Sequence, residues 1–97
     1  MAIKFRKPAV KFIERADPDT VSRIQDKLSQ LLIVVEEQSI IPFTELDIKQ
    51  MKGEWEGFYR LRIGKVRLIF TVDITSGDIE IYVIGSRGDI YKNSWFS

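Results

Sequence analysis

With 97 residues, of which 44% are hydrophobic and 30% charged, the chain is long enough for one globular domain with a single core, and its composition argues against disorder. Its formal net charge of +1 at pH 7 gives no overall signal for nucleic acid, so any such signal must come from how the charges are distributed. The absence of cysteine and histidine excludes disulfide bonds, thiolate metal sites and an imidazole general base, so we expect no metal ion and no other cofactor.

The sequence shows no export or membrane signal. Its first ten residues contain no apolar stretch of signal-peptide length, and the longest uninterrupted apolar run covers only Leu31 to Val35. A membrane-spanning helix needs about 20 predominantly apolar residues. We therefore expect a cytoplasmic protein without a membrane partner.

The N-terminal part of the chain predicts a short strand followed by two helices. Residues 2–6 alternate apolar and basic side chains, which favours a strand. Lys7-Pro8 suits the start of a first helix, and Asp17-Pro18 suits the start of a second one with the aspartate as N-cap. From there to about Gln38, six apolar residues recur at helical spacing and form a stripe that would cover one face of a sheet: Val21, Ile24, Leu28, Leu31, Leu32 and Val35.

The connection over residues 39–56 is expected to be irregular, with Ile48 to Met51 as a short edge strand. Trp55 lies either at the edge of the core or on the surface as a platform for a nucleic-acid base. Lys49 and Lys52 come just ahead of the next element and would extend its basic surface.

Residues 57–72 predict a β-hairpin. Two runs rich in aromatic and β-branched residues flank Gly64-Lys65, and a two-residue loop with glycine first suits a tight primed turn. Counting outward from this loop places Arg62 opposite Arg67. Period-two alternation then gives one face without any charge and a second face that carries three arginines: Arg60, Arg62 and Arg67.

The arginine-bearing face needs a counter-charge. At about 5 Å and an effective dielectric constant of about 20, Arg62 and Arg67 would repel each other by roughly 3 kcal/mol, or by less than about 1 kcal/mol if their stems splay into water. No Asp or Glu lies within residues 57–72. We therefore expect a phosphate-rich ligand to supply the counter-charge, because guanidinium donors match phosphate oxygens. The alternative is a solvated face that is neutralised by acids elsewhere in the fold.

The C-terminal part predicts a turn over residues 73–78 and a further antiparallel strand over Ile79 to Gly85, which completes a β-meander. This strand is nearly continuously apolar, as is typical of a central strand covered on both faces. Arg87 follows it in a loop, where it either joins a functional site or forms a surface ion pair with Asp89. The sequence has no glycine-rich phosphate loop and no metal-ligand spacing, which excludes dehydrogenases, kinases and zinc enzymes.

The order of one strand, two helices and a meander, together with the segments MKGEWEGFYRLRIGKVRLIFTVD and IYVIGSRGDIYK, resembles the RelE/ParE superfamily of bacterial toxins. The resemblance covers nearly the whole chain. It implies a single RelE-like α+β domain over residues 1–97, with both helices packed on one face of the sheet. It also implies the toxin of a type II toxin–antitoxin system, an endoribonuclease that cleaves mRNA on the ribosome and binds a cognate antitoxin. The family's catalytic positions fall on five residues of this chain: Arg60, Arg62, Arg67, Arg87 and Tyr91.

The implied chemistry is attack of a ribose 2′-hydroxyl on the adjacent phosphate. Arginines would stabilise the extra charge on the phosphorane, but they stay protonated and are not general bases. Tyr91 is the family's candidate for proton transfer or for stacking on a nucleobase. Glu54 and Glu56 are weaker candidates for the general base, and their position just before the hairpin is the only reason to consider them. Lys52 matches a position that contacts the RNA backbone, and the expected RNA-binding set is Lys49, Lys52, Lys65 and Lys92.

Members of the family often carry lysine in the first hairpin strand and histidine or lysine before the terminal arginine, where this chain has Arg60, Arg62 and Ser86. Three activities stay open: a ribosome-dependent endoribonuclease, a ParE-like inhibitor of DNA gyrase, and an antitoxin-binding relative with weak activity. Retention of the whole arginine and tyrosine set favours the first, with the ribosome and mRNA as its partners.

Overall fold

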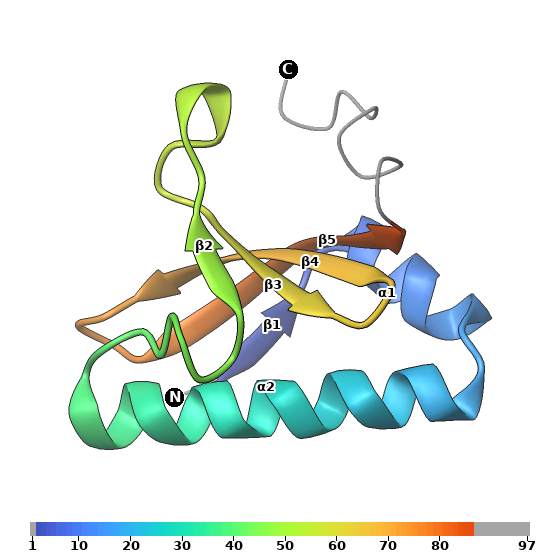
Figure 1. Cartoon of the computed structure of the whole chain (residues 1–97), viewed down its shortest axis with the longest axis horizontal. Coiled ribbons are helices and arrows are strands. Elements are labelled where there is room, and N and C mark those ends of the chain that lie inside the picture. Colours follow the sequence, from blue (N-terminus) through green and yellow to red (C-terminus); the bar gives the residue numbers. More distant parts are fainter. Residues whose placement is uncertain (1, 87–97) are drawn as a thin grey trace.

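The structure is a computed structural model that describes residues 2–86, in which two helices lie against a five-stranded sheet (Figure 1). This arrangement confirms the predicted α+β fold. The positions expected at Arg87, Tyr91 and Lys92 lie outside the described residues. The elements in chain order are β1 (Ile3–Phe5), α1 (Lys7–Arg15), α2 (Pro18–Gln38), β2 (Ile48–Gln50), a 3-10 turn (Gly53–Trp55), β3 (Tyr59–Ile63), β4 (Val66–Asp73) and β5 (Asp78–Ser86).

The strands are arranged in the order β1-β5-β4-β3-β2. Neighbouring strands from β2 to β5 are antiparallel, as the meander predicts, whereas β1 pairs with β5 in parallel. The expectation that the strand over Ile79 to Gly85 is central needs correction, because β4 holds the middle position. An apolar run indicates an interior strand, and β5 is interior, but the run does not distinguish one interior position from another.

Helix α2 begins and ends with local backbone devices. The Asp17 carboxylate accepts a hydrogen bond from the Thr20 amide at 2.7 Å, and hydrogen bonding to Thr20 lowers the pKa of Asp17 below its ordinary value of 3.8. Ser39 ends the helix in the left-handed conformation with φ of 53°. Two residues of the predicted stripe, Val21 and Leu32, are half-buried. The other four are buried: Ile24, Leu28, Leu31 and Val35.

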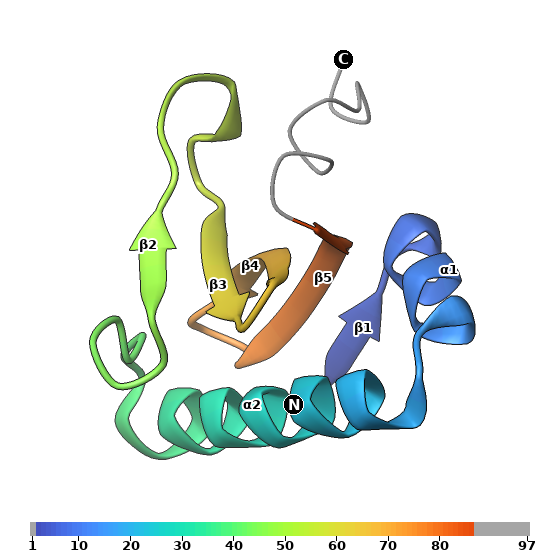
Figure 2. The ribbon, with the colours of Figure 1, turned by 45° about the vertical axis from the view of Figure 1, so that its right-hand side comes forward.

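The main core fills the space between α2 and one face of the sheet (Figure 2). Leu61, Leu68 and Phe70 from β3 and β4 are fully buried there, because alternate residues of each strand point to the same side. Helix α1 packs against β5 and buries Ala9 completely. Neither of the two described helices covers the opposite face of the sheet, which we call the outer face.

The predicted hairpin register is confirmed at every position from the Ile63–Val66 pair to the Tyr59–Phe70 pair. Gly64 has φ of 60° at the turn, a conformation that glycine adopts without steric cost. The register between β4 and β5 shifts after Ile69, so that Tyr82 is an extra residue on β5. The hairpin and this bulge together set which side chains reach the outer face.

Candidate nucleic-acid interface

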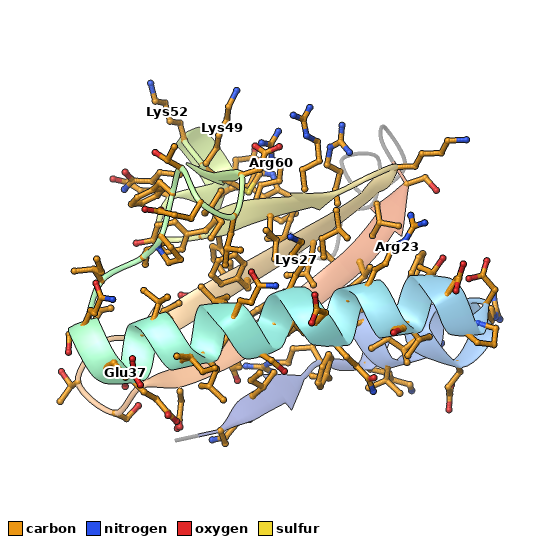
Figure 3. The ribbon with its side chains drawn as sticks, turned by 60° about the horizontal axis from the view of Figure 1, so that its bottom comes forward. Arg23, Lys27, Glu37, Lys49, Lys52 and Arg60 are labelled. Atoms are coloured by element: carbon orange, nitrogen blue, oxygen red, sulfur yellow. The ribbon has the colours of Figure 1, made fainter. Side chains whose placement is uncertain are left out.

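Four cationic side chains meet on the outer face of β2, β3 and β4. The strand register places Lys49 opposite Arg60 and Arg62 opposite Arg67, so each cation has another cation directly across from it. Figure 3 shows Lys49 and Lys52 extending from this side of the molecule, away from α2. The sheet thus gathers like charges that would repel each other without an anion. We call Lys49, Arg60, Arg62 and Arg67 the cationic cluster.

One internal carboxylate serves two members of this cluster. The Oδ2 atom of Asp47 accepts from Nε of Arg62 at 2.6 Å, and its Oδ1 atom lies 3.5 Å from Nη2 of Arg60. The side chain of Arg60 is only 15% exposed, and its Nε atom is buried without a hydrogen-bond partner. Asp47 therefore neutralises part of the charge but leaves a buried donor of Arg60 unsatisfied.

Arg67 is the most buried cation of the cluster, with 8% of the residue exposed. Its Nη1 atom donates to the backbone oxygen of Gly64 at 3.2 Å. Within residues 2–86, Arg67 forms no ion pair with any carboxylate. Opposite Arg67 on β5 lies Gly85, which has no side chain to cover the guanidinium from that strand.

The expectation that an outside ligand supplies the whole counter-charge is wrong for Arg60 and Arg62, because Asp47 pairs with both. For these two arginines the alternative holds, since an acid from outside the hairpin neutralises part of their charge. For Arg67, the described residues provide only a neutral carbonyl oxygen. Burying a charge without a counter-charge is costly, so such a group is typical of an anion-binding site.

The middle of the outer face, beside the cationic cluster, is apolar and aromatic. Ile69 and Val83 are fully buried on it, under a cover of half-buried side chains. Trp55 packs edge-on against Phe58 at 6.4 Å between ring centroids, and Phe58 packs edge-on against Tyr82 at 4.8 Å. Trp55 therefore belongs to a second small core, which agrees with its interpretation as a core-edge aromatic.

The far end of this apolar region is closed by Arg6, a residue that the sequence did not single out. Its guanidinium carbon lies 4.9 Å from the centroid of the Tyr82 ring, and its Nη2 atom lies 3.1 Å from Oε1 of Glu80. Arg6 thus has both a ring and a carboxylate, whereas Arg67 has no carboxylate among the described residues.

The remaining predicted positions are distributed around the cluster rather than inside it. Lys52 is exposed just before the 3-10 turn, and Glu54 and Glu56 are exposed within and after it. Lys65 lies in the hairpin turn, where it lines a hollow shared with Arg23 of α2. Because Ile63 and Val66, whose side chains face the core, also line this hollow, Lys65 is on the side of α2 rather than among the cationic cluster.

Asp47 is a functional candidate that was not predicted from the sequence, although a signal was present. It directly precedes the predicted edge strand, and pairing that strand with β3 brings Asp47 level with Arg62. The Arg62 amide in fact donates to the Asp47 backbone oxygen at 3.2 Å. Asp47 lies outside residues 57–72, so it is not among the acids of the hairpin itself.

The described part of the chain offers neither a metal site nor a membrane-spanning helix. Among residues 2–86, no group of three or more Asp, Glu, His or Cys side chains is placed to hold a metal ion. Neither of the two described helices is long and apolar enough to cross a membrane. The ionic groups of the cationic cluster and its internal partner are therefore three arginines, one lysine and the Asp47 carboxylate.

Comparison with known proteins places this geometry in a family context. Residues 3–91 match the family model described as the ParE toxin of the type II toxin–antitoxin system parDE. A comparison with curated protein sequences gives no match.

Solved structures show the same fold at low sequence identity. The RelE–RelB complex from Pyrococcus horikoshii has a chain with a TM-score of 0.68 and 23% identity, over 90% of this chain and 94% of that one. The RelB–RelE complex from Methanococcus jannaschii gives a TM-score of 0.68 and 24% identity, over 92% and 95% of the two chains. The isolated E. coli RelE toxin gives 0.62 and 17%, over 93% and 89%. At these identities the likeness shows the fold alone, while the family match extends over nearly the entire sequence.

Proposed function

Because the chain belongs to the ParE toxin family of type II toxin–antitoxin systems, within the RelE/ParE superfamily, we propose that it is a ribosome-dependent endoribonuclease. In this proposal it cleaves mRNA by directing the ribose 2′-hydroxyl onto the adjacent phosphate. The ribosome presents the mRNA, and the cationic cluster receives the phosphate.

The observation that carries the proposal is the state of Arg67. The residue is only 8% exposed, and among residues 2–86 its guanidinium has only the Gly64 carbonyl as a hydrogen-bond partner. A phosphate oxygen would supply the missing charge through short, charge-assisted hydrogen bonds. A donor that is already fixed in a largely desolvated position also gains more from charge that develops in the transition state than a solvated one does.

Arg62 is placed to bind the same phosphate. It lies directly across from Arg67, and its side chain is half exposed, so a phosphate approaching from the outer face would meet both guanidinium groups. Two arginines around one phosphorane would stabilise the charge that distinguishes it from the starting diester. Arg60, with its buried unsatisfied Nε, would supply a third donor.

Proton transfer requires groups other than these arginines, since guanidinium remains protonated. Tyr91 remains the proposed contributor to proton transfer from the C-terminal segment. Arg87 would add a further cationic donor to the phosphate, and Lys92 would bind the RNA backbone there. Lys49 and Lys52, which extend away from α2, would bind neighbouring phosphates of the same strand. Lys65 would contact nucleic acid beside the hairpin turn.

The proposed partners follow from the family and its solved relatives. The relatives from P. horikoshii and M. jannaschii were crystallised with RelB. We accordingly propose that a cognate antitoxin of that kind binds this chain and controls it in the cytoplasm, where ribosomes are translating mRNA.

A second candidate function is inhibition of DNA gyrase. It is favoured by the description of the matching family as the ParE toxin of parDE. A gyrase inhibitor would need a protein-binding surface but would have no need for a buried cation that lacks a counter-charge. The state of Arg67 therefore favours nuclease chemistry over this alternative.

The test is to induce the chain in growing bacteria and to map mRNA 5′ ends and DNA breaks in the same cultures. We expect new 5′ ends within translated regions, their loss in an Arg67→Gln variant, and their persistence in an Arg15→Gln variant. Arg15 is a matched control because it is an exposed arginine of α1. Intact translated mRNA together with arrested growth and accumulating DNA breaks would overturn the nuclease proposal in favour of gyrase.

A further inference from the structure

Asp47 is held unusually firmly for a residue in a connection. It has φ of 53°, a left-handed conformation that aspartate tolerates better than most residues do. Its backbone oxygen accepts from the Arg62 amide at 3.2 Å, and its carboxylate contacts two arginine side chains. Backbone and side chain of Asp47 are thus both fixed against β3.

The contact between Asp47 and Arg62 uses a particular edge of the guanidinium. Asp47 Oδ2 accepts from Nε at 2.6 Å, which leaves the two terminal nitrogens of Arg62 without a hydrogen-bond partner in the described structure. Those nitrogens form a planar fork that matches two phosphate oxygens. Because the Nε edge is fixed, the terminal fork has a defined direction, and the half-exposed side chain keeps the fork accessible.

The charge balance allows Asp47 to order the cluster without closing it to anions. One carboxylate stands among the four cations of the cluster, so repulsion between Arg60 and Arg62 is reduced while the surface remains positive. Arg67 makes no contact with Asp47 and keeps its charge for a ligand.

We propose that Asp47 is a positioning residue of the phosphate site: it fixes the Nε edge of Arg62 so that the terminal fork of this arginine and the buried Arg67 receive the same phosphate. The identification of that phosphate as part of mRNA rests on the proposed function. The ordering of Arg62 by Asp47 does not.

In the Asp47→Asn variant, the affinity for RNA and the rate of RNA cleavage should change in opposite directions. Removal of one negative charge makes the surface more attractive to a polyanion, so single-stranded RNA should bind two- to fivefold more tightly. Loss of the charge-assisted contact leaves Arg62 mobile, so turnover on programmed ribosomes should fall about tenfold. A merely structural role would weaken both together.

The ordering itself can be measured without any nuclease assay. In the free protein, the Nε–Hε signal of Arg62 should exchange with water at least tenfold faster in Asp47→Asn than in the native chain, while the corresponding signal of Arg67 should not change. Titration with inorganic phosphate should shift the Arg62 and Arg67 signals together in the native chain and separately in the variant. Asp26→Asn is the matched control, because Asp26 is an exposed carboxylate on α2 that contacts Gln30 rather than an arginine.

A double substitution tests whether Asp47 acts through Arg62. Lysine has neither the Nε–H group that Asp47 holds nor a terminal fork of donors. Asp47→Asn should therefore have little further effect on turnover in an Arg62→Lys background. An Arg62 signal that is unchanged by Asp47→Asn would overturn the inference, as would additive losses in the double variant. If the signals respond as expected but no RNA is cleaved by the native chain, the positioning role stands and the nuclease proposal fails.

Discussion

Replacing Arg67 by methionine should make the protein more stable and inactive at the same time. Methionine keeps much of the length of arginine but carries no charge. The change removes the charge of a residue that is only 8% exposed, together with its hydrogen bond to the Gly64 carbonyl. It also removes the repulsion between Arg67 and its cross-strand neighbour Arg62.

The size of the effect follows from three contributions. The desolvation penalty of a buried ion is several kcal/mol, and its removal favours the variant. Relief of the repulsion from Arg62 adds about 1 kcal/mol, because Asp47 already pairs with that arginine and screens part of its charge. The lost charged hydrogen bond to Gly64 opposes these gains by about 1.5–3 kcal/mol. We therefore expect the free energy of unfolding to rise by about 1–3 kcal/mol, in line with other replacements of buried ions by apolar side chains.

Urea denaturation followed by circular dichroism measures this change. With a slope of about 1–3 kcal/mol per molar urea, the midpoint should rise by roughly 1 M at unchanged slope. Arg62→Met provides the contrast on the same face: Arg62 is half exposed and paired with Asp47, so its loss should cost about 0–1 kcal/mol. A loss of more than about 1 kcal/mol in Arg67→Met would mean that the guanidinium is needed for folding, and the case for an anion site would lose its physical basis.

Four other outcomes are expected. Asp17 has a lowered pKa in the folded state, so its contribution to stability should be present above pH 3.8 and lost as the pH falls through the lowered value; Asp17→Ala should flatten the acid limb of the unfolding curve. Leu31→Ala, at a fully buried position of α2, should cost about 2–5 kcal/mol by urea denaturation. Gly64→Ala should cost about 1 kcal/mol because φ there is 60°; the nearest atom to an added Cβ, Nη1 of Arg23, would lie at 3.9 Å, so a steric clash adds nothing to the cost. The dependence of log affinity for single-stranded RNA on log salt should lose about 0.7 in slope in Arg67→Met, if that arginine contacts one phosphate.

The elements that could be predicted from the sequence are those with strong local signals. The Asp17-Pro18 start and the periodic stripe define α2, and the loop at Gly64-Lys65 fixes the whole register of β3 against β4. Both depend on residues that are close in the sequence, so propensity and spacing are sufficient.

The features that could not be predicted depend on contacts between distant segments. β1 pairs with β5 across more than 70 residues, and nothing in its three residues encodes the parallel direction. The ring of Tyr82 reaches Arg6 and Phe58 because a bulge shifts the register of β5, and a bulge has no reliable sequence signature here.

The cationic cluster combines both kinds of information. The pairing of Arg62 with Arg67 could be predicted from the hairpin alone. The partner of Arg62 lies 15 residues upstream and could be found only by pairing the predicted edge strand with the first hairpin strand. The hairpin alone thus predicts the repulsion between Arg62 and Arg67 but not the carboxylate that relieves part of it. Among the three hairpin arginines, Arg67 alone has no carboxylate partner within residues 2–86.

The division of the outer face explains how the fold accommodates this cost. Ile69 and Val83 are fully buried under aromatic side chains on one half, and they bind the centre of the sheet together from the side opposite α2. Burial of two such side chains contributes roughly 3–6 kcal/mol, as an upper estimate. This exceeds the net cost of about 1–3 kcal/mol expected for the charge of Arg67, which has no carboxylate partner within residues 2–86. A sheet with a core on only one face would have less free energy of folding to offset the cost of a buried cation. The second small core therefore helps the fold to tolerate a cationic cluster that can bind an anion.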